Sequence, residues 1–332
     1  AILTSANLSG RDLTNVDFEK ADLSGANLSL ANLQNAILTG AKMITDGTTS
    51  NNGVSADTSG TVNLSGANLT NAKLIKADLT GANLGVKLHA SDAQQNVNTN
   101  LVGADLTGAN LTGTTLTGTN FSDTHSVTEV VTAANLTSAI LTSANLVSQD
   151  LTSVDFEKAV LSGADLTGAD LENAILTGAQ LNTDGTNTVK LMGAILTNAK
   201  LIKADLTGAD LGVKLHASDA QQNVNTNLVG ADLTGAILRG ADLASAILVN
   251  DTVGSKGANL EKADLTGADL SATVFSVTHS TTEVVTAANL TSAILTSANL
   301  SGQDLTSVDF EKADLSGANL QTADLENAIL TG

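Results

Sequence analysis

Two of the four histidines are the residues best suited to bind a metal ion. His89 and His216 lie in two copies of the segment KLHASDAQ, in which an aspartate, Asp92 or Asp219, follows three residues later. Imidazole and carboxylate groups bind divalent metals, but a closed site needs three or four ligands and each copy supplies two. These four residues are therefore the nearest approach to a metal site, and the simpler hypothesis is a histidine that lies in a solvated loop.

The remaining sequence holds no recognisable arrangement for catalysis. His125 and His279 stand in two THS segments, and Glu129 is the nearest acidic residue to the first. The chain has no cysteine, which excludes disulfides, thiolate zinc sites and cysteine nucleophiles. The acidic residues follow no calcium-loop spacing, and no P-loop, Rossmann glycine pattern or Ser-His-Asp arrangement stands in a suitable context. We expect neither enzymatic activity nor a cofactor.

A five-residue repeat decides which elements position these side chains. From Ala1 the chain reads AILTS, ANLSG, RDLTN, VDFEK and ADLSG, with a small first residue, Asp or Asn second and leucine third. This period matches neither the 3.6-residue period of a helix nor the two-residue period of a strand. It fits a backbone that turns a corner every five residues. The first and third side chains then point inward, and the second points outward.

Four such sides close a coil of about 20 residues, and stacked coils hydrogen-bond like parallel strands about 4.8 Å apart. Leucine columns then fill the interior, and Asn and Asp ladders cover the outside. The absence of Trp, Tyr and Pro agrees with a core of small, uniform aliphatic groups. The sequence therefore predicts an all-β solenoid whose filled interior leaves no cavity for a substrate.

The five-residue repeats quoted above resemble the pattern of the pentapeptide-repeat family, in which Ala, then Asp or Asn, then Leu precede two variable residues. The resemblance covers most of the chain. It implies a right-handed quadrilateral parallel β-helix with inserted loops. The family hosts several functions, so the fold alone selects none of them. Some members look like B-form DNA and protect DNA gyrase, which implies gyrase as one partner.

A longer repeat overlies the short one. The segment AILTSANL begins at Ala1, Ala139 and Ala293, which predicts module 1 at 1–138, module 2 at 139–292 and the start of a third at 293–332, all in one continuous solenoid. The five-residue pattern fails in short stretches, which we interpret as loops. They are approximately 46–61, 87–100, 124–133, 184–190, 214–227, 249–257 and 278–287.

Isoleucine at the outward second position is a candidate interaction feature. It recurs in every module as a pair with one constant spacing. Single apolar side chains on a surface are normal, but a recurring pair predicts contact with a neighbouring molecule or with a folded-back loop. The pairs are Ile2 and Ile37, Ile140 and Ile175, and Ile294 and Ile329.

Charge and module repetition lead to a structural role. The chain has 15 basic and 34 acidic residues, a net charge of -19, which argues against binding nucleic acid or an anionic membrane. No apolar run approaches the ~20 residues of a membrane span. The chain starts and stops within a repeat, without a capping helix. We therefore expect a non-enzymatic, uncapped segment of an extracellular or cell-surface filament, sheath or adhesin stalk.

In this interpretation the partner is the protein itself, through end-to-end stacking of coils and lateral packing. Two alternatives stay open. One is an acidic DNA mimic that binds DNA gyrase in the cytoplasm, since the charge is spread along the solenoid. The other is a protein-binding scaffold with an unspecified partner.

Overall fold

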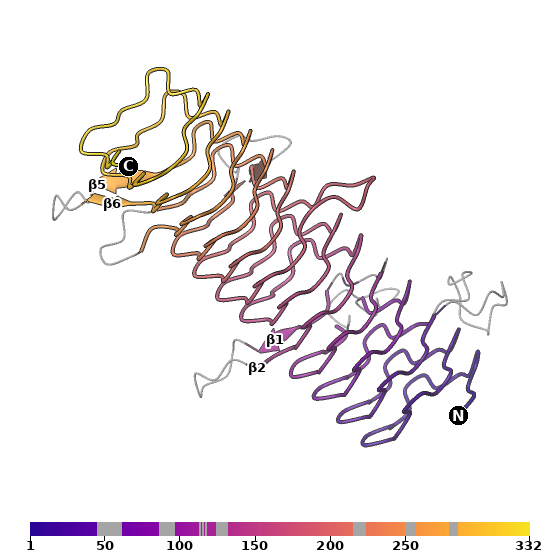
Figure 1. Ribbon diagram of the computed structural model, residues 1–332. Coiled ribbons are helices and arrows are strands. Elements are labelled where there is room, and N and C mark those ends of the chain that lie inside the picture. Colours follow the sequence, from indigo (N-terminus) through magenta and orange to yellow (C-terminus); the bar gives the residue numbers. More distant parts are fainter. Residues whose placement is uncertain are drawn as a thin grey trace. The chain divides into compact units, whose positions relative to one another are not determined.

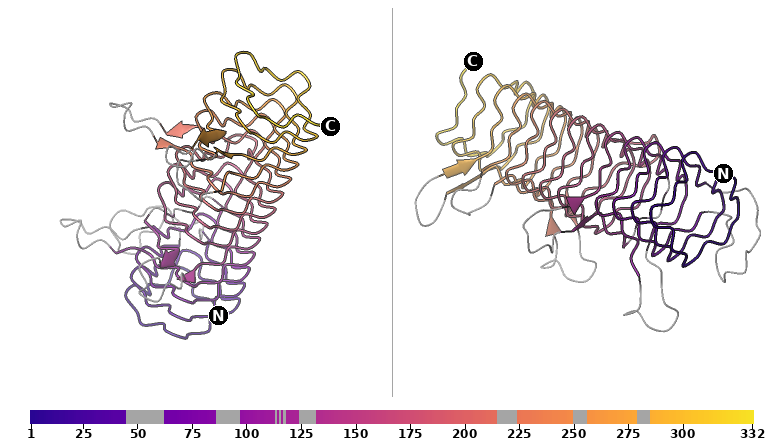
Figure 2. Two further views of the ribbon diagram at one scale, coloured as in Figure 1. Left: turned by 90° about the vertical axis from the view of Figure 1, so that its left-hand side faces the viewer. Right: turned by 90° about the horizontal axis from the view of Figure 1, so that it is seen from below.

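The computed structural model describes residues 1–44, 62–85, 97–112, 114, 116, 118–123, 132–214, 224–249, 256–278 and 285–332. The chain forms two compact units, Ala1–Leu161 and Ser162–Gly332, which we call unit 1 and unit 2. Within each unit the backbone runs in successive coils that lie one upon another (Figure 1), and two further views show the same stacking (Figure 2). The predicted module boundaries remain a prediction, because they describe sequence duplication rather than compactness.

Parallel β-bridges join each coil to the next and show its length. In unit 1, Ile2 bridges Asp22 and Asp22 bridges Lys42, so each coil without a loop advances the chain by the same four repeats. The amide of Leu3 donates to the carbonyl of Asp22 at 2.7 Å, and the amide of Asp22 donates to the carbonyl of Ala1 at 2.9 Å. A bridge recurs at the second position of every repeat, so a coil has four sides. Each unit is therefore a quadrilateral parallel β-helix.

Leucine and alanine fill the interior of the coils. Leu23 and Leu28 are fully buried, and Ala21 exposes 1% of its surface. Phe156 takes the place of a leucine at the third position and is also fully buried. Burying one leucine side chain contributes about 1.5–3 kcal/mol, so the repeated column is the main source of stability. The predicted inward and outward positions are confirmed.

Most corners are β-turns whose third residue has a positive φ. In the first corner the amide of Ala6 donates to the carbonyl of Leu3 at 3.0 Å, and Ser5 has a φ of 56°. The left-handed region costs an ordinary residue about 1–2 kcal/mol and is tolerated best by Gly and Asn. The fifth position of the repeat falls at this point, which explains why Gly and Asn are frequent there.

Three antiparallel pairs of short strands stand where the chain leaves the coil and rejoins it. In unit 1, β1 (Ser122–Asp123) pairs with β2 (Thr132–Ala133). In unit 2, β3 (Val213–Lys214) pairs with β4 (Val224–Asn225), and β5 (Ser276–Thr278) pairs with β6 (Val285–Ala287). Each pair brackets a segment that the sequence predicts to be a loop. No helix in the described ranges is long and apolar enough to cross a membrane.

Three loop predictions extend too far. The coil resumes before residues 100 and 227, and in the predicted loop 184–190 Val189 is already buried and Lys190 bridges Asp165 and Asp210. Thr226 is fully buried, and Asn227 forms parallel bridges on both sides. The hydroxyl oxygen of Thr226 lies 2.9 Å from the carbonyl oxygens of Leu191 and Gly212 and accepts the amide of Gly193 at 3.0 Å. These bonds let a threonine occupy the inward small position. Thr99 makes the same set of contacts in unit 1.

Candidate functional site

The outward second-position side chains form columns, because bridges join them from coil to coil. We name each column by one member. In unit 1 the Asn100 column contains Asp12, Asn32, Asn68, Asn100 and Asn120. In unit 2 the Ile195 column contains Asp170, Ile195, Asn227, Ile247 and Val274, and the Asp242 column contains Asp165, Lys190, Asp210, Asp242, Asp269, Asn299 and Asn319. The Ile237 column contains Gln180, Asp205, Ile237, Asp264, Ile294 and Asp314, and the Asn259 column contains Ile175, Lys200, Asp232, Asn259, Asn289, Asp309 and Ile329.

Many column carboxylates serve the turn directly after them. Oδ1 of Asp22 accepts the hydroxyl of Ser24 at 2.6 Å and the amide of Ser24 at 3.1 Å. The hydroxyl and the amide of Ser24 lower the pKa of Asp22 because they favour the ionised carboxylate. Burial acts to raise the pKa of Asp264, but hydrogen bonds from Thr266 and Arg239 lower it overall. These Asp side chains therefore stabilise the turn that follows them, and this use limits the oxygen atoms that remain for a partner.

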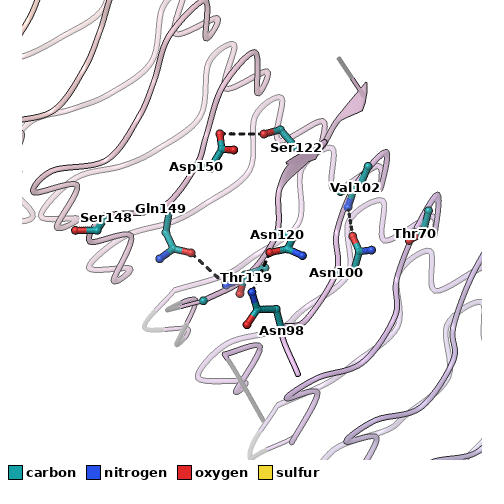
Figure 3. Close-up of a pocket in the computed structure, with 11 residues that line it drawn as sticks. Thr70, Asn98, Asn100, Val102, Thr119, Asn120, Ser122, Ser148, Gln149 and Asp150 are labelled. Atoms are coloured by element: carbon teal, nitrogen blue, oxygen red, sulfur yellow. Dashed lines mark hydrogen bonds between the residues drawn. The ribbon is translucent and has the colours of Figure 1, made fainter. Parts of the chain in front are cut away.

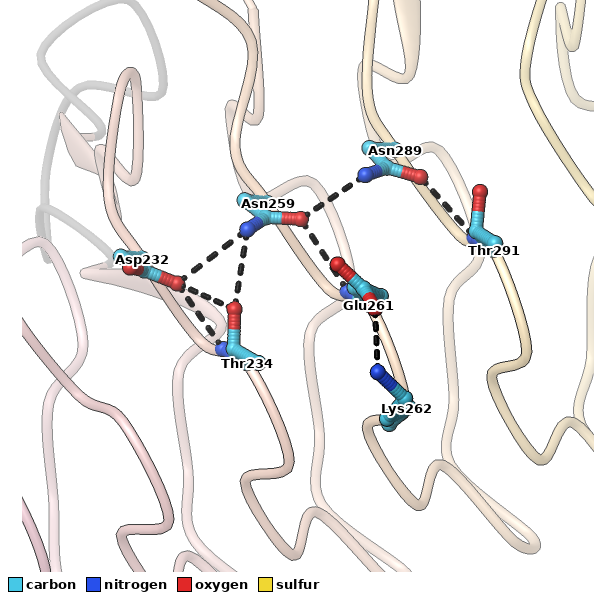
Figure 4. A network of polar contacts seen from close by, with 7 residues as sticks. All are labelled: Asp232, Thr234, Asn259, Glu261, Lys262, Asn289 and Thr291. Atoms are coloured by element: carbon cyan, nitrogen blue, oxygen red, sulfur yellow. Dashed lines mark hydrogen bonds and ion pairs between the residues drawn. The ribbon is translucent and has the colours of Figure 1, made fainter.

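Amide side chains link one coil to the next along a column. Figure 4 shows the Asn259 column of unit 2, where Nδ2 of Asn259 donates to the hydroxyl of Thr234 at 2.9 Å. Oδ1 of Asn259 accepts Nδ2 of Asn289 at 3.0 Å and the amide of Glu261 at 3.2 Å. Asp232 accepts the hydroxyl of Thr234 at 2.6 Å and completes the chain of contacts. Such a ladder fixes the register of the outer surface, and most members of the column are half-buried.

A groove lies on the outside of unit 1, along the Asn100 column (Figure 3). It has a volume of about 520 Å³. Its lining is polar, with amides, hydroxyls and one carboxylate; the residues with the most polar atoms are Asn98, Asn100, Asn120, Ser122, Gln149 and Asp150. The sequence predicted a filled interior, which the structure shows, but it contained no indication of this outer groove.

The polar groups of the groove are hydrogen-bonded to one another. Nδ2 of Asn98 donates to Oδ1 of Asn120 at 3.2 Å, and the hydroxyl of Ser122 donates to Oδ1 of Asp150 at 3.0 Å. No histidine, lysine or cysteine stands among its eleven lining residues, all of which the structure describes. The lining can therefore bind a small polar molecule through hydrogen bonds, but it does not pair a nucleophile with a strong base.

One buried glutamine in this groove breaks the repeat and could have been found from the sequence. Gln149 occupies an inward position that is normally small, yet exposes 6% of its surface. Its Oε1 accepts the amide of Thr119 at 3.1 Å, and its Nε2 donates to the carbonyl of Val147 at 3.0 Å. Gln303 of unit 2 repeats the second contact, with Ser301 as its acceptor. A large polar residue at a position that is normally Ala could have indicated, from the sequence alone, a departure from the regular coil at Gln149.

The predicted contact of the isoleucine pairs with a neighbouring molecule or a folded-back loop stays a prediction, and the structure shows where each isoleucine stands. Ile2 and Ile140 lie in one column of unit 1, and Ile37 lies in another. In unit 2, Ile294 belongs to the Ile237 column, whereas Ile175 and Ile329 belong to the Asn259 column. In the two pairs that lie within one unit, Ile2 with Ile37 and Ile294 with Ile329, the members stand on different sides of the coil. All six side chains point outward, from half-buried Ile37 and Ile175 to Ile2 at 84% exposure.

The Asp242 column concentrates negative charge in unit 2. Asp210 bridges Asp242, which in turn bridges Asp269. A Cβ built on Gly212 would lie 3.4 Å from Oδ1 of Asp210 and 3.5 Å from Oδ2 of Asp242, so both carboxylates face this glycine. Burial raises the pKa of Asp210, and the charge of Asp242 raises it further, against the opposing effect of the Gly212 amide. These carboxylates favour a positively charged neighbour.

The candidate metal ligands His89, Asp92, His216 and Asp219 lie outside the described residues, as do His125 and His279. Among the residues that the structure does describe, no group of three or more His, Cys, Asp or Glu side chains is placed to hold a metal. The possibility of a metal in the histidine segments therefore remains a prediction.

Comparison with known proteins identifies the origin of this architecture. The family model for pentapeptide repeats matches most of the chain; the matched residues are 1–40, 62–85, 97–125, 132–168, 155–182, 189–212, 224–250, 256–276 and 286–321. The chain belongs to the pentapeptide-repeat family. Its fold is accordingly the right-handed quadrilateral β-helix, as the sequence implied. Pentapeptide-repeat proteins are in general non-enzymatic scaffolds or protein-binding proteins.

Several solved structures are similar to this pentapeptide-repeat chain. HetL, involved in heterocyst differentiation regulation in the cyanobacterium Nostoc sp., is 27% identical over 95% of this chain and 91% of its own, with a TM-score of 0.27. Trypsin-treated QnrB1, a plasmid-mediated fluoroquinolone resistance protein, is 17% identical over 72% and 89%, with a TM-score of 0.34. A pentapeptide repeat protein of the Arabidopsis thaliana thylakoid lumen is 25% identical over 42% and 86%, with a TM-score of 0.25. All three TM-scores are low. A search of curated proteins found no match.

Proposed function

We propose that this pentapeptide-repeat protein is a scaffold that binds other proteins along its outer columns. The observation that carries the proposal is the separation of the two sides of the coil. Leucine and alanine close the inside, whereas second-position side chains stand in register on the outside. Such a surface presents a partner protein with a regular array of side chains, one about every 4.8 Å along a column. The groove of unit 1 adds a place for a small polar group of a partner.

Site-specific photocrosslinking in the native host tests the scaffold proposal. A photoreactive amino acid is placed singly at outward positions on different columns, for example at Asn100, Ile195, Ile237 and Asn259. We expect a discrete protein adduct from positions of one column and none from the others. Equal, diffuse labelling from every column, or no adduct at all, would contradict a scaffold with a dedicated binding face.

A structural filament at the cell surface or outside the cell is a second candidate. The recurrence of AILTSANL at residues 1, 139 and 293 supports it, because duplicated modules suit an extended structural element. Coils stacking end to end would continue the leucine columns and the backbone ladder from one molecule to the next. Negative-stain microscopy of native material is the test. Fibres would support this candidate, and discrete particles of one length would exclude it.

Gyrase binding through DNA mimicry ranks lower, because basic side chains interrupt the negative surface. Lys190 contacts Asp165 at 3.3 Å, and Arg239 pairs with the largely buried Asp264. The continuous line of phosphates that DNA presents has no such interruptions. We expect no inhibition of gyrase in a DNA supercoiling assay. Inhibition at sub-micromolar concentration would place this function first.

A further inference from the structure

Unit 2 carries on its outer surface a row of four side chains, of which Ile195, Ile247 and Val274 are apolar and Asn227 lies between the two isoleucines. Bridges connect Ile195 to Asn227, Asn227 to Ile247 and Ile247 to Val274, in four successive coils. We call these four residues the apolar row. Ile195 is 38% exposed, and Ile247 and Val274 are half-buried. At about 4.8 Å per coil the apolar row is ~14 Å long. Val224 in β4, three residues before Asn227, is 47% exposed.

The apolar row is not required by the fold, as an internal comparison shows. Residues 189–248 repeat residues 62–121 with an offset of 127, so that Asn68 and Asn120 correspond to Ile195 and Ile247. Asn68 and Asn120 form the same parallel bridges through Asn100. The two copies of this segment therefore carry different outward side chains, amide in unit 1 and isoleucine in unit 2, although both form the same kind of coil. Isoleucine at these positions of unit 2 contributes something other than coil closure.

The charges around the apolar row indicate what can cover it. Residues 162–332 contain 8 Lys and Arg against 20 Asp and Glu, a net of -12. On the preceding side of the coil, Asp210, Asp242 and Asp269 stand beside the last three coils of the row, while Lys190 stands beside Ile195. Asp170 bridges Ile195 at one end of the row. A second copy of this acidic unit would be repelled, whereas a basic partner would be attracted.

The spacing of the apolar row matches the apolar stripe of an α-helix. A helix rises about 5.4 Å per turn, close to the ~4.8 Å between coils, so a helix lying along the row presents about one apolar side chain to each coil. Lysine or arginine on the flank of that helix would face the Asp242 column. A partner helix with an apolar stripe and a basic flank therefore satisfies both the apolar and the charged part of this surface.

We propose that the apolar row of unit 2 is the docking site for a basic amphipathic helix of a partner protein. This inference rests on the proposed scaffold function and assigns to it one face and one class of partner. The two isoleucines supply apolar burial, and Asp210, Asp242 and Asp269 supply attraction to the basic flank. The corresponding amide-lined face of unit 1 lacks the apolar part.

Binding of a synthetic helix to the full chain tests this proposal. The probe is a fluorescent peptide with leucine along one stripe and lysine elsewhere, and binding is followed by anisotropy. We expect saturable binding that weakens with added salt, and no binding of peptides in which the sequence is scrambled or lysine is replaced by glutamate. The variant Ile195→Asn with Ile247→Asn should weaken binding by about tenfold or more, since two apolar contacts are lost.

The variant Ile237→Asn is the matched control. Ile237 is 39% exposed, but bridges Asp205 and Asp264 in another column, so its loss should leave the affinity unchanged while costing the fold as much as Ile195→Asn. Asp242→Asn with Asp269→Asn should reduce the salt dependence without touching an isoleucine. Equal loss with Ile237→Asn overturns the proposal. The proposal is also overturned if analytical ultracentrifugation shows that the protein is a dimer and that Ile195→Asn with Ile247→Asn makes it a monomer. Adducts from another column in the crosslinking experiment would refute this docking site yet leave the scaffold function standing.

Discussion

Leu23 and Asp22 are neighbours in the chain but face opposite sides of the coil. Leu23 is fully buried among leucine columns, whereas Asp22 is half-exposed and accepts two hydrogen bonds from Ser24. We expect Leu23→Asp to cost about 4 kcal/mol or more, because it buries a carboxyl group without a partner. Asp22→Asn keeps an accepting Oδ1 and should change stability by less than about 0.5 kcal/mol. Urea unfolding followed by circular dichroism measures both, and equal losses would contradict the assignment of the two faces.

Leu30 occupies a turn position that disfavours leucine. Its φ is 59° and it is 44% exposed, so it accepts left-handed strain with an exposed apolar side chain. Asn35 holds the same position one repeat later, with a φ of 57°. We expect Leu30→Asn to raise the free energy of unfolding by about 0.5–1 kcal/mol, because Asn tolerates this region better. The reverse change, Asn35→Leu, is the control and should lower it; a gain from both changes would mean that turn strain is not the cause.

At the scale of single residues the sequence predicted the inward and outward positions well, because period five constrains every side chain. Leu23 and Ala21 are inside as expected. The sequence predicts a loop at the buried Thr226, since a hydroxyl at an inward position is favourable only when carbonyls such as that of Leu191 are within reach. Leu191 belongs to a neighbouring coil that is remote in the sequence, so the local pattern does not encode this contact.

Two carboxylates five residues apart, in two different columns, respond to pH in opposite directions. Burial acts to raise the pKa of Asp205, but hydrogen bonds from Thr207 and Asn182 lower it overall, whereas burial and the charge of Asp242 raise the pKa of Asp210. The lowered pKa contributes stability above the unfolded value of about 3.9, and this is lost as the pH falls through the folded pKa. The raised pKa means that ionised Asp210 destabilises the fold, and acidification relieves this.

Asp205→Asn should therefore lower the unfolding temperature at pH 7, with a smaller difference in acid. Asp210→Asn should raise it at pH 7 and have little effect once the carboxyl group is protonated. Asn83, the counterpart of Asp210 in unit 1, shows that an amide fits this position of the coil. Thermal unfolding of each variant from pH 3 to 7 is the measurement, and a destabilised Asp210→Asn at pH 7 would contradict the inferred electrostatics.

At the scale of elements, the existence of outer columns could be predicted from the sequence, but which residues share a column could not. Ile2 and Ile37 are seven repeats apart without a loop between them, and four repeats make one coil, so they fall on different sides of it. The length of a loop decides which side of the coil the next repeat occupies, and for this reason the row of Ile195, Ile247 and Val274 is hidden in the sequence. Its members are unequally spaced along the chain and align once the intervening loops have been closed.

Each unit is built by addition of equivalent coils, and the tolerance of the chain to deletions should reflect this. Bridges join Asn135 to Asp155 and Ile140 to Val160, so residues 139–158 form one full turn of the coil. Removing this turn places Ala159, Val160 and Leu161 where Ala139, Ile140 and Leu141 stood, and every column keeps its register. In a solenoid, stability is approximately a sum over units and their nearest-neighbour interfaces.

We therefore expect the chain without residues 139–158 to unfold cooperatively, with an unfolding temperature a few degrees below that of the parent. A matched deletion of residues 139–156 removes two residues fewer and shifts the rest of the chain by two positions. It brings Ala159 to the place of Leu141 and Lys158 to that of Ile140, so that a cavity opens inside and Leu161 moves into the turn. This shorter deletion should be the more damaging one, with a broadened, less cooperative transition in differential scanning calorimetry. Equal behaviour of the two deletions would show that the stack does not count residues by full turns, and the column register on which both proposals depend would lose its basis.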